Sequence, residues 1–320
     1  MIEKVAEFLK KYDIKKKTVL AAVSGGVDSV VLLHILNSLK NEFSLDIKAI
    51  HLNHNWRGDE SRGDMEFVQS LANDMGLEFY CDTLDDDIKK TELCARDARY
   101  GFFEKALEKF ETNVCFLAHN KNDNVETFLY RVIKGTGVSG LVSIPAVRKP
   151  YYRPLLNFSR CEIEEFAAKN GIKFRTDASN EDIKYKRNFI RKNIVPEILK
   201  INDNAINSIG SLIGIAAEHN EIIEDYLKTI ENEVFDKNCT DWAHRRPLII
   251  RDKFLSLKPA VQREILSRYF KGLLKNRDFK NILKIQNFII ENENSTLSVN
   301  KDTFLRVHKN GIFLYKKMSK

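Results

Sequence analysis

The first half of the chain alternates short apolar runs with segments of helical spacing, and this alternation constrains the fold more than any other feature. The apolar runs that are typical of buried strands span residues 18–23, 46–54, 77–84 and 113–119. The segments with helical spacing span residues 27–39, 64–76, 91–110 and 123–135. Strands that alternate with helices predict an α/β fold with a doubly wound parallel sheet. Such a sheet binds its ligands at the carboxyl ends of its strands.

The pattern changes after about residue 147, and 320 residues are more than one compact core usually holds. We therefore expect residues 1–200 to form the sheet domain. Residues 201–230 show one long helical pattern and are expected to form a helical connector. Residues 231–320 are expected to form a smaller mixed domain. The pair Asn310–Gly311 between two apolar runs predicts a β-hairpin there.

Composition limits the function classes. The formal net charge of +7 suggests a polyanionic partner such as nucleic acid. Charge alone does not decide whether the protein binds nucleic acid, because basic proteins without such a partner are common. The five cysteines are scattered without a C-x-x-C pair, so the sequence signals neither a zinc ribbon nor an iron–sulfur site. The first residues lack the apolar core that is expected of a signal peptide, and no apolar run reaches the length that spans a bilayer. We expect a cytoplasmic protein with no membrane partner.

The string SGGVDS between the first strand and the first helix of this alternation is the most informative motif. Its glycines let the backbone approach a ligand closely, and the N–H groups at a helix start attract an anion. The loop therefore predicts a phosphate site, and an ordinary strand-to-helix turn is the alternative. The residues expected to contact the nucleotide are Ser24, Gly25, Gly26, Val27, Asp28 and Ser29. An acid beside phosphates needs a cation between them, so Asp28 indicates Mg²⁺.

Two carboxylates follow the fourth strand. Asp123 and Glu126 are three residues apart on an expected helix, so both can face one pocket and attract a cationic ligand. A solvent-facing helix surface is the alternative. Arg99, on the preceding helix, can bind a carboxylate or a phosphate through its fork of donors, or it can be an ordinary surface arginine.

Basic and aromatic residues mark two further segments. His51 and His54 lie toward the end of the second strand, and Arg57 follows it. For these residues a nucleotide or nucleobase contact is favoured over a zinc site, and a structural role stays open. A later run interleaves basic residues with aromatic ones, which suits RNA phosphates and stacked bases, although a solvated helix face gives the same pattern. The residues of this run that we assign to RNA are Lys186, Arg187, Asn188 and Arg191.

The string SGGVDS resembles the SGGxDS signature of the PP-loop ATP pyrophosphatases. Members of that class cut ATP between its α and β phosphates and adenylate a substrate oxygen. The motif alone leaves GMP synthetase, NAD synthetase, asparagine synthetase and the tRNA thiolases open. Further segments narrow the choice: HLNHNWRG (51–58), ARDARYGFF (95–103), AHNKNDNVETFLYRVIKGTGVSGL (118–141), YRPLL (152–156) and TDASNEDIKYKRNFIR (176–191). In this order they resemble the tRNA(Ile)-lysidine synthetase family over roughly residues 18–199.

The resemblance implies a ligase that joins lysine to C2 of the wobble cytidine of an isoleucine tRNA. The cytidine is first adenylated by ATP with Mg²⁺, and AMP and pyrophosphate are released. The implied catalytic residues are Asp28, Arg99, Asp123 and Glu126, of which the last three bind lysine. His51 and His119 are assigned to ATP. The tRNA contacts are assigned to Arg57 and the basic run, with the C-terminal domain in support, and a homodimer is left open.

The chain departs from the family pattern at three positions. Asn120, Asn122 and Asn124 stand where the family usually has a second histidine, an acid and a glutamine, whereas His119 and Asp123 are retained. Two rival functions stay open. A tRNA thiolase of the same fold would need paired cysteines, and none is evident in the sequence. The second rival is a nucleotide-sensing, RNA-binding protein that catalyses no reaction.

Overall fold

The computed structural model describes residues 1–53, 55, 59–84, 91–175, 186–240, 247–274 and 279–316. These residues form two compact units. The first unit comprises Met1–Tyr130 and Ser143–Ile213, and the second comprises Arg131–Val142 and Gly214–Lys320. The chain therefore passes from one unit to the other at three points. The last of these points lies inside the long helix α10 (Ala205–Val234), where the sequence predicts a connector.

The first unit carries the alternation of strands and helices. Its elements up to the fourth strand are α1 (Ile2–Lys11), β1 (Thr18–Ala22), α2 (Val27–Phe43), β2 (Asp46–Asn53), α3 (Asp59–Asp74), β3 (Glu78–Thr83), α4 (Glu92–Lys109) and β4 (Cys115–Phe116). After α5 (Lys121–Lys134), which begins in this unit, come β5 (Val147–Arg148), β6 (Tyr151–Tyr152), α7 (Arg160–Lys169), α8 (Lys186–Phe189), the π-helical turn η2 (Ile190–Ile194) and α9 (Val195–Ile201).

The strands of the first unit form one sheet in the order β3-β2-β1-β4-β6-β5. All neighbouring pairs are parallel except the edge pair, in which β5 runs antiparallel to β6. The α/β fold class with its doubly wound parallel sheet is thus confirmed, and β5 adds one antiparallel strand at the edge. Only two residues separate β5 from β6, and so short a connection can join only antiparallel strands.

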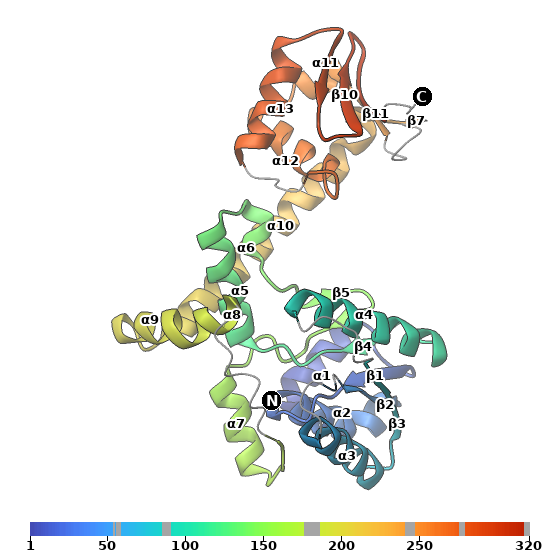
Figure 1. Cartoon of the computed structure of the whole chain (residues 1–320), viewed down its shortest axis with the longest axis vertical. Helices are drawn as coiled ribbons and strands as arrows, with labels where there is room; N and C mark the ends of the chain where they lie inside the picture. The colour runs from blue at the N-terminus through green and yellow to red at the C-terminus, as the bar shows by residue number, and fades with distance from the viewer. Residues whose placement is uncertain are drawn as a thin grey trace. The chain divides into compact units, whose positions relative to one another are not determined.

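Side chains of β1 alternate between two cores on the faces of the sheet. Val19 packs into a core built with α1, α2, α3 and α7, whereas Leu20 packs on the other face with Phe102 and Phe103 of α4. This period of two follows from strand geometry. In Figure 1 the blue strands β1, β2 and β3 lie together with α2 and α3 beside them. The result is a sheet whose strand ends are held rigidly from both sides.

Local signals fix the ends of several helices. Thr91 caps α4 as predicted, since its hydroxyl accepts a hydrogen bond from the Cys94 N–H at 3.2 Å. Gly76, with φ +63°, follows α3 as expected for a C-terminal glycine. A capping box begins α7, in which Ser159 and Glu162 each accept a hydrogen bond from the other's N–H group. These caps set where α4 and α7 begin.

The second unit contains an antiparallel sheet with the strand order β7-β8-β11-β10-β9. Its strands are β7 (Phe235–Thr240), β8 (Pro247–Ile250), β9 (Ser295–Ser298), β10 (Thr303–Val307) and β11 (Gly311–Lys316). Its helices, besides the last turns of α5 and most of α10, are α6 (Val138–Leu141), α11 (Arg251–Leu255), α12 (Pro259–Tyr269) and α13 (Phe279–Glu291). The predicted hairpin at Asn310–Gly311 is confirmed by the antiparallel pair β10–β11. In the part of the chain that the structure describes, no helix is both long and apolar enough to cross a membrane.

Candidate active site

The candidate site lies where the direction of strand order reverses. From β1 the chain adds β2 and β3 on one side, and then returns to add β4 on the other side of β1. Open parallel sheets bind ligands at such a switch point, outside the carboxyl ends of the strands. The segments that leave these ends are residues 24–29 after β1 and residues 117–126 after β4. They carry the glycine loop and the acidic pair that the sequence singles out.

The glycine loop turns sharply between β1 and α2. Gly25 has φ +93°, a conformation that side-chain-bearing residues rarely adopt, and Gly26 is the N-cap of α2 without a side chain to cap it. The N–H groups of the first helical turn have no intrahelical acceptor, so the helix begins with donors directed out of its end. This is the geometry that receives a phosphate.

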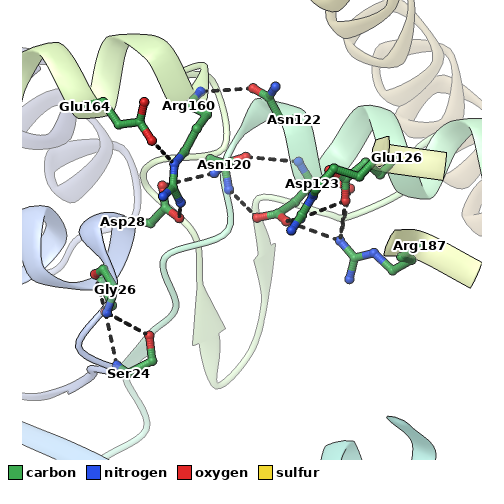
Figure 2. Close-up of polar contacts among 12 residues, drawn as sticks. Ser24, Gly26, Asp28, Asn120, Asn122, Asp123, Glu126, Arg160, Glu164 and Arg187 are labelled. Carbon is green, nitrogen blue, oxygen red and sulfur yellow. Dashed lines mark hydrogen bonds and ion pairs between the residues drawn. The ribbon is translucent and has the colours of Figure 1, made fainter. Parts of the chain in front are cut away.

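The two serines of the loop bond mainly within it. The Ser29 hydroxyl donates to the Gly26 carbonyl at 2.9 Å and accepts from the Ser24 N–H at 3.1 Å. The Ser24 and Ser29 hydroxyl oxygens lie 3.1 Å apart. Ser29 is buried, whereas Ser24 is exposed. Figure 2 shows Ser24 beside Gly26 in the loop. The structure therefore places Ser29 as a brace of the turn and leaves Ser24 accessible to a ligand.

Asp28, in the first turn of α2, holds two partners. Arg160 Nη1 donates to one carboxylate oxygen at 2.5 Å, and Asn120 Nδ2 donates to the other at 3.1 Å. Burial raises the pKa of Asp28, and the Arg160 charge and the Asn120 amide offset that rise only in part. The carboxylate is thus oriented by donors on both sides. Its oxygens keep lone pairs for a further ligand.

Asn120 connects the two halves of the site. Besides donating to Asp28, its side-chain oxygen accepts from the Asp123 N–H at 3.0 Å, and its own N–H donates to the Asp123 carboxylate at 3.0 Å. This reciprocal pair is a capping box at the start of α5. Figure 2 shows the resulting chain of contacts from Arg160 through Asp28 and Asn120 to Asp123. The glycine loop and the acidic pair therefore form one polar network.

The other two asparagines also have fixed partners. Asn122 Oδ1 accepts from the Arg160 N–H at 2.9 Å, which joins α5 to the start of α7. The buried Asn124 Oδ1 accepts from the Ile144 N–H at 2.8 Å. All three positions at which the sequence departs from the family pattern thus contribute hydrogen bonds that hold neighbouring segments together.

The acidic pair faces two arginines of the chain. Arg191 Nε and Nη2 donate to the two oxygens of Glu126 at 2.6 and 3.0 Å, and Nη2 lies 3.3 Å from Asp123 Oδ1. Arg187 Nη2 lies 3.4 Å from Asp123 Oδ1 and 3.9 Å from Glu126 Oε2. Burial raises the pKa of Glu126, and the bidentate bond from Arg191 opposes that rise. The side chain of Glu126 is only 3% exposed. Two negatively charged carboxylates thus face two positively charged guanidinium groups, and their formal charges cancel.

Two histidines border this network. His51 Nδ1–H donates to the Val23 carbonyl at 2.8 Å, while its buried Nε2 has no partner within the described residues. Burial lowers the pKa of His51, so the ring is neutral and Nε2 is an acceptor. Burial also lowers the pKa of His119 to about 4, against the pull of Asp123. Both rings therefore offer uncharged imidazole to the site.

The remaining predicted residues are less closely joined to the network. Arg99 is exposed on α4 and near enough to His119 for its charge to act on that ring. Lys186 is exposed on α8, and Asn188 is partly buried there. Arg57 and His54 lie outside the described residues. Arg187 and Arg191, which the sequence assigns to RNA, are paired with the acidic residues, and their contact with RNA stays a prediction.

Two contributors are absent from the predicted set. Arg160 binds Asp28 from the start of α7, and no sequence signal marks it, because the preceding strand β6 is only two residues long. Arg175 is the second, since its N–H donates to the Gly25 carbonyl at 3.0 Å and its side chain pairs with Asp64 of α3. Arg175 thereby ties the glycine loop to α3.

The residues present fit a magnesium ion that is held mainly by phosphates. Asp28 offers carboxylate oxygens beside the helix start, and Mg²⁺ commonly takes one or two carboxylates together with substrate phosphates. Among the described residues, no group of three or more histidine, cysteine or acidic side chains is arranged to hold a metal alone. Asp28 therefore stays the predicted ligand of a metal that would arrive with a nucleotide.

A family model described as a PP-loop domain matches residues 1–198. The sheet, the glycine loop and this match define a PP-loop protein. A U34-tRNA thiolase of Methanococcus maripaludis shares the fold, with a TM-score of 0.56 and 17% identity over 68% of this chain and 78% of the thiolase. At that identity the likeness concerns the fold alone.

Curated relatives narrow the class. The tRNA(Ile)-lysidine synthase of Clostridium acetobutylicum is 34% identical over 84% of this chain and 59% of its own length. Those of Caldanaerobacter subterraneus and Clostridioides difficile are 30% and 32% identical, over 100% and 99% of this chain and 70% and 69% of their own lengths. The chain belongs to the tRNA(Ile)-lysidine synthase family. The chain covers 59% of the length of the C. acetobutylicum relative. It covers 60% of the length of a further relative, the tRNA(Ile)-lysidine synthase of Clostridium tetani.

Proposed function

We propose that the protein joins lysine to C2 of the wobble cytidine of an isoleucine tRNA in two steps, adenylation of the cytidine and attack by the lysine ε-amine. The observation that carries this proposal is the polar network through Asn120. It joins the N-terminus of α2, whose free N–H groups suit a phosphate, to the acidic pair, in which Glu126 is buried and Asp123 is partly buried. A site with an anion receptor beside cation receptors suits a reaction between ATP and an amine.

The first step takes place at the glycine loop. The N–H groups at the start of α2 and the exposed hydroxyl of Ser24 bind the phosphates. Arg160 pairs with Asp28 in the first turn of α2 and therefore places a positive charge near these phosphates. Asp28 would hold Mg²⁺, which supplies positive charge against the charge that develops on the phosphates. The acceptor Nε2 of His51, beside the end of β1, suits a donor of the nucleoside, such as a ribose hydroxyl or the adenine amino group.

The second step takes place at the acidic pair. Asp123 and Glu126 bind the lysine ε-ammonium, and one of them accepts the proton that the amine loses before it attacks. Arg99 binds the lysine carboxylate. His119, held neutral among arginines, keeps an uncharged acceptor next to this site.

The tRNA is bound by exposed basic residues such as Lys186 and by the C-terminal unit. A protein of net charge +7 attracts the phosphate backbone over its surface. The target base must leave its stack to reach the site, as bases of single-stranded loops can. The cytoplasm, where tRNA is present, is the proposed location.

The test is incubation of the protein with ATP, labelled lysine and unmodified tRNA. We expect label in the RNA and release of AMP and pyrophosphate. Asp28→Ala is expected to abolish tRNA-dependent pyrophosphate formation, whereas Glu126→Ala is expected to retain it and to lose lysine incorporation. Sulfur transfer in place of lysine transfer, or nucleotide binding without pyrophosphate release, would show that a rival function is correct.

A further inference from the structure

The acidic pair is occupied by the chain's own cations. Arg191 makes two charge-assisted bonds to Glu126, at 2.6 and 3.0 Å, and a third contact to Asp123 at 3.3 Å. Arg187 adds a contact to Asp123 at 3.4 Å. A planar guanidinium that binds a carboxylate through both oxygens leaves little room for another donor. A ligand can therefore bind these carboxylates only after it displaces at least one of the arginines.

The charge balance excludes simple addition of a ligand cation. Two carboxylates already face two guanidinium groups, and Glu126 is 3% exposed. A third cation would leave an uncompensated positive charge in a desolvated site, which is unfavourable. If lysine binds there, as the proposed function requires, one arginine has to leave.

The position of Arg191 makes it the arginine that leaves. Its side chain is 38% exposed, so it can turn into solvent without opening a core. It also belongs to the π-helical turn η2, whose backbone pattern is rare and is often found at functional sites. A π-turn that relaxes to α-helical bonding changes the direction of the side chains within it.

From these contacts we infer that Arg191 is an internal substitute for the substrate ammonium, exchanged for the lysine ε-amine when lysine binds. The inference rests on the proposed function, and it assigns to Arg191 a part in lysine selection. Because the arginine is tethered, it competes at a high effective concentration, and a free cation must bind the acidic pair well to displace it. A fixed structural ion pair is the opposing interpretation, in which Arg191 serves only to hold the segment with α8 and η2 on α5.

The experiment measures lysine binding by calorimetry to the full chain without RNA. Arg191→Ala removes the competitor and is expected to bind lysine at least about tenfold more tightly than the wild type, the ratio that one charge-assisted hydrogen bond accounts for. Arg191→Lys is expected to lie between them, because a lysine side chain binds a carboxylate through one point of contact. Norleucine, which lacks the ε-amine, is expected to gain nothing.

Lys200→Ala is the matched control. Lys200 is an exposed cation on α9 that pairs with Glu197, so its loss changes the charge of the same segment without touching the acidic pair. Its affinity for lysine is expected to equal that of the wild type. An Arg191→Ala protein that melts cooperatively yet binds lysine no better than the wild type would overturn the exchange.

A measurement on the wild type guards against a variant that fails to fold. Saturating lysine is expected to speed hydrogen exchange of the amides in residues 186–194 severalfold, and unchanged exchange with lysine bound would overturn the inference. Incorporation of labelled lysine into tRNA separates the two proposals. Incorporation by the wild type without the gain in Arg191→Ala contradicts the exchange alone, whereas no lysine binding by any variant contradicts the proposed function.

Discussion

Asn120 organises the site more than its amide side chain suggests. It is 4% exposed and bonds to Asp28 through its nitrogen and to the Asp123 N–H through its oxygen. A histidine at this position has one ring nitrogen to donate and, when neutral, one to accept, so the amide can replace both functions. At this departure from the family pattern, Asn120 thus makes the connection between the two halves of the site.

Replacement of Asn120 tests this connection. Asn120→Ala leaves Asp28 without one donor and α5 without its capping partner, so we expect a loss of about 1–3 kcal/mol in the free energy of unfolding. Urea denaturation monitored by circular dichroism measures it. Asn170→Ala, an exposed asparagine at the end of α7, is the control and is expected to change stability by less than about 0.5 kcal/mol. Equal losses in the two variants would contradict the bridging role.

The neutral state of His119 predicts a dependence of stability on pH. Its pKa is about 4 in the folded protein and near 6.5 for an unperturbed histidine, so the unfolded state binds the proton more tightly. The stabilising contribution is complete above pH 6.5 and is lost as the pH falls toward 4. Asp28 and Glu126 act in the opposite direction, because burial raises their pKa. The difference between the wild type and His119→Gln isolates the histidine.

We expect this difference to shrink steadily between pH 6.5 and pH 4.5 in urea unfolding experiments. A difference that stays constant across that range would mean that His119 carries no altered pKa. Measurements at constant ionic strength keep the screening of the neighbouring arginines equal at every pH.

At the scale of single elements, the glycine loop depends on one left-handed residue. Gly25→Ala places a Cβ on a backbone with φ +93°, and we expect a loss of about 1–2 kcal/mol in stability together with weaker ATP binding. Gly101→Ala is the matched control, because Gly101 lies inside α4 with open space around it and is expected to gain about 0.5–1 kcal/mol. Thermal unfolding measures both, and a shift of the same sign in the two variants would contradict the account of the loop.

The sequence was sufficient to predict the alternating strands and helices of the first half and the glycine loop at the start of α2. Apolar periodicity identified the four parallel strands of the first half, and the glycine string marked the start of α2. Local signals such as Thr91 and Gly76 identified helix ends because the bonds they make are local. The edge strand β5 was missed because two residues carry no periodicity.

The partners of the charged residues could not be predicted in the same way. Asp28 and Arg160 are separated by 132 positions, and only the folded sheet brings them together. Arg187 and Arg191 look like exposed basic residues in the sequence, because a basic run that pairs with distant acids does not differ in pattern from one that faces RNA. The packing of α8 and η2 on α5 is a tertiary contact, and local sequence patterns do not predict it.

At the scale of the whole molecule, the exchange of Arg191 predicts that tRNA and lysine strengthen each other's binding. RNA phosphates that attract Arg191 draw it from the acidic pair, which then accepts lysine. Linkage requires the same factor in both directions, and coupling of this kind is typically about 5–150-fold. The dissociation constant of lysine with and without tRNA measures the factor, and Arg191→Ala is expected to reduce it toward one.

The three crossings between the units have a practical consequence for dissecting the protein. The second unit includes Arg131–Val142, twelve residues that follow Tyr130 in the middle of α5, where Arg131 donates to the Gly140 carbonyl at 2.8 Å. A fragment that begins at Gly214 lacks this piece, so its failure to bind RNA would report missing structure and not a missing recognition surface. The role of the C-terminal part is better tested by point substitutions in the intact chain. A circularly permuted gene that keeps residues 131–142 with the second unit is the alternative.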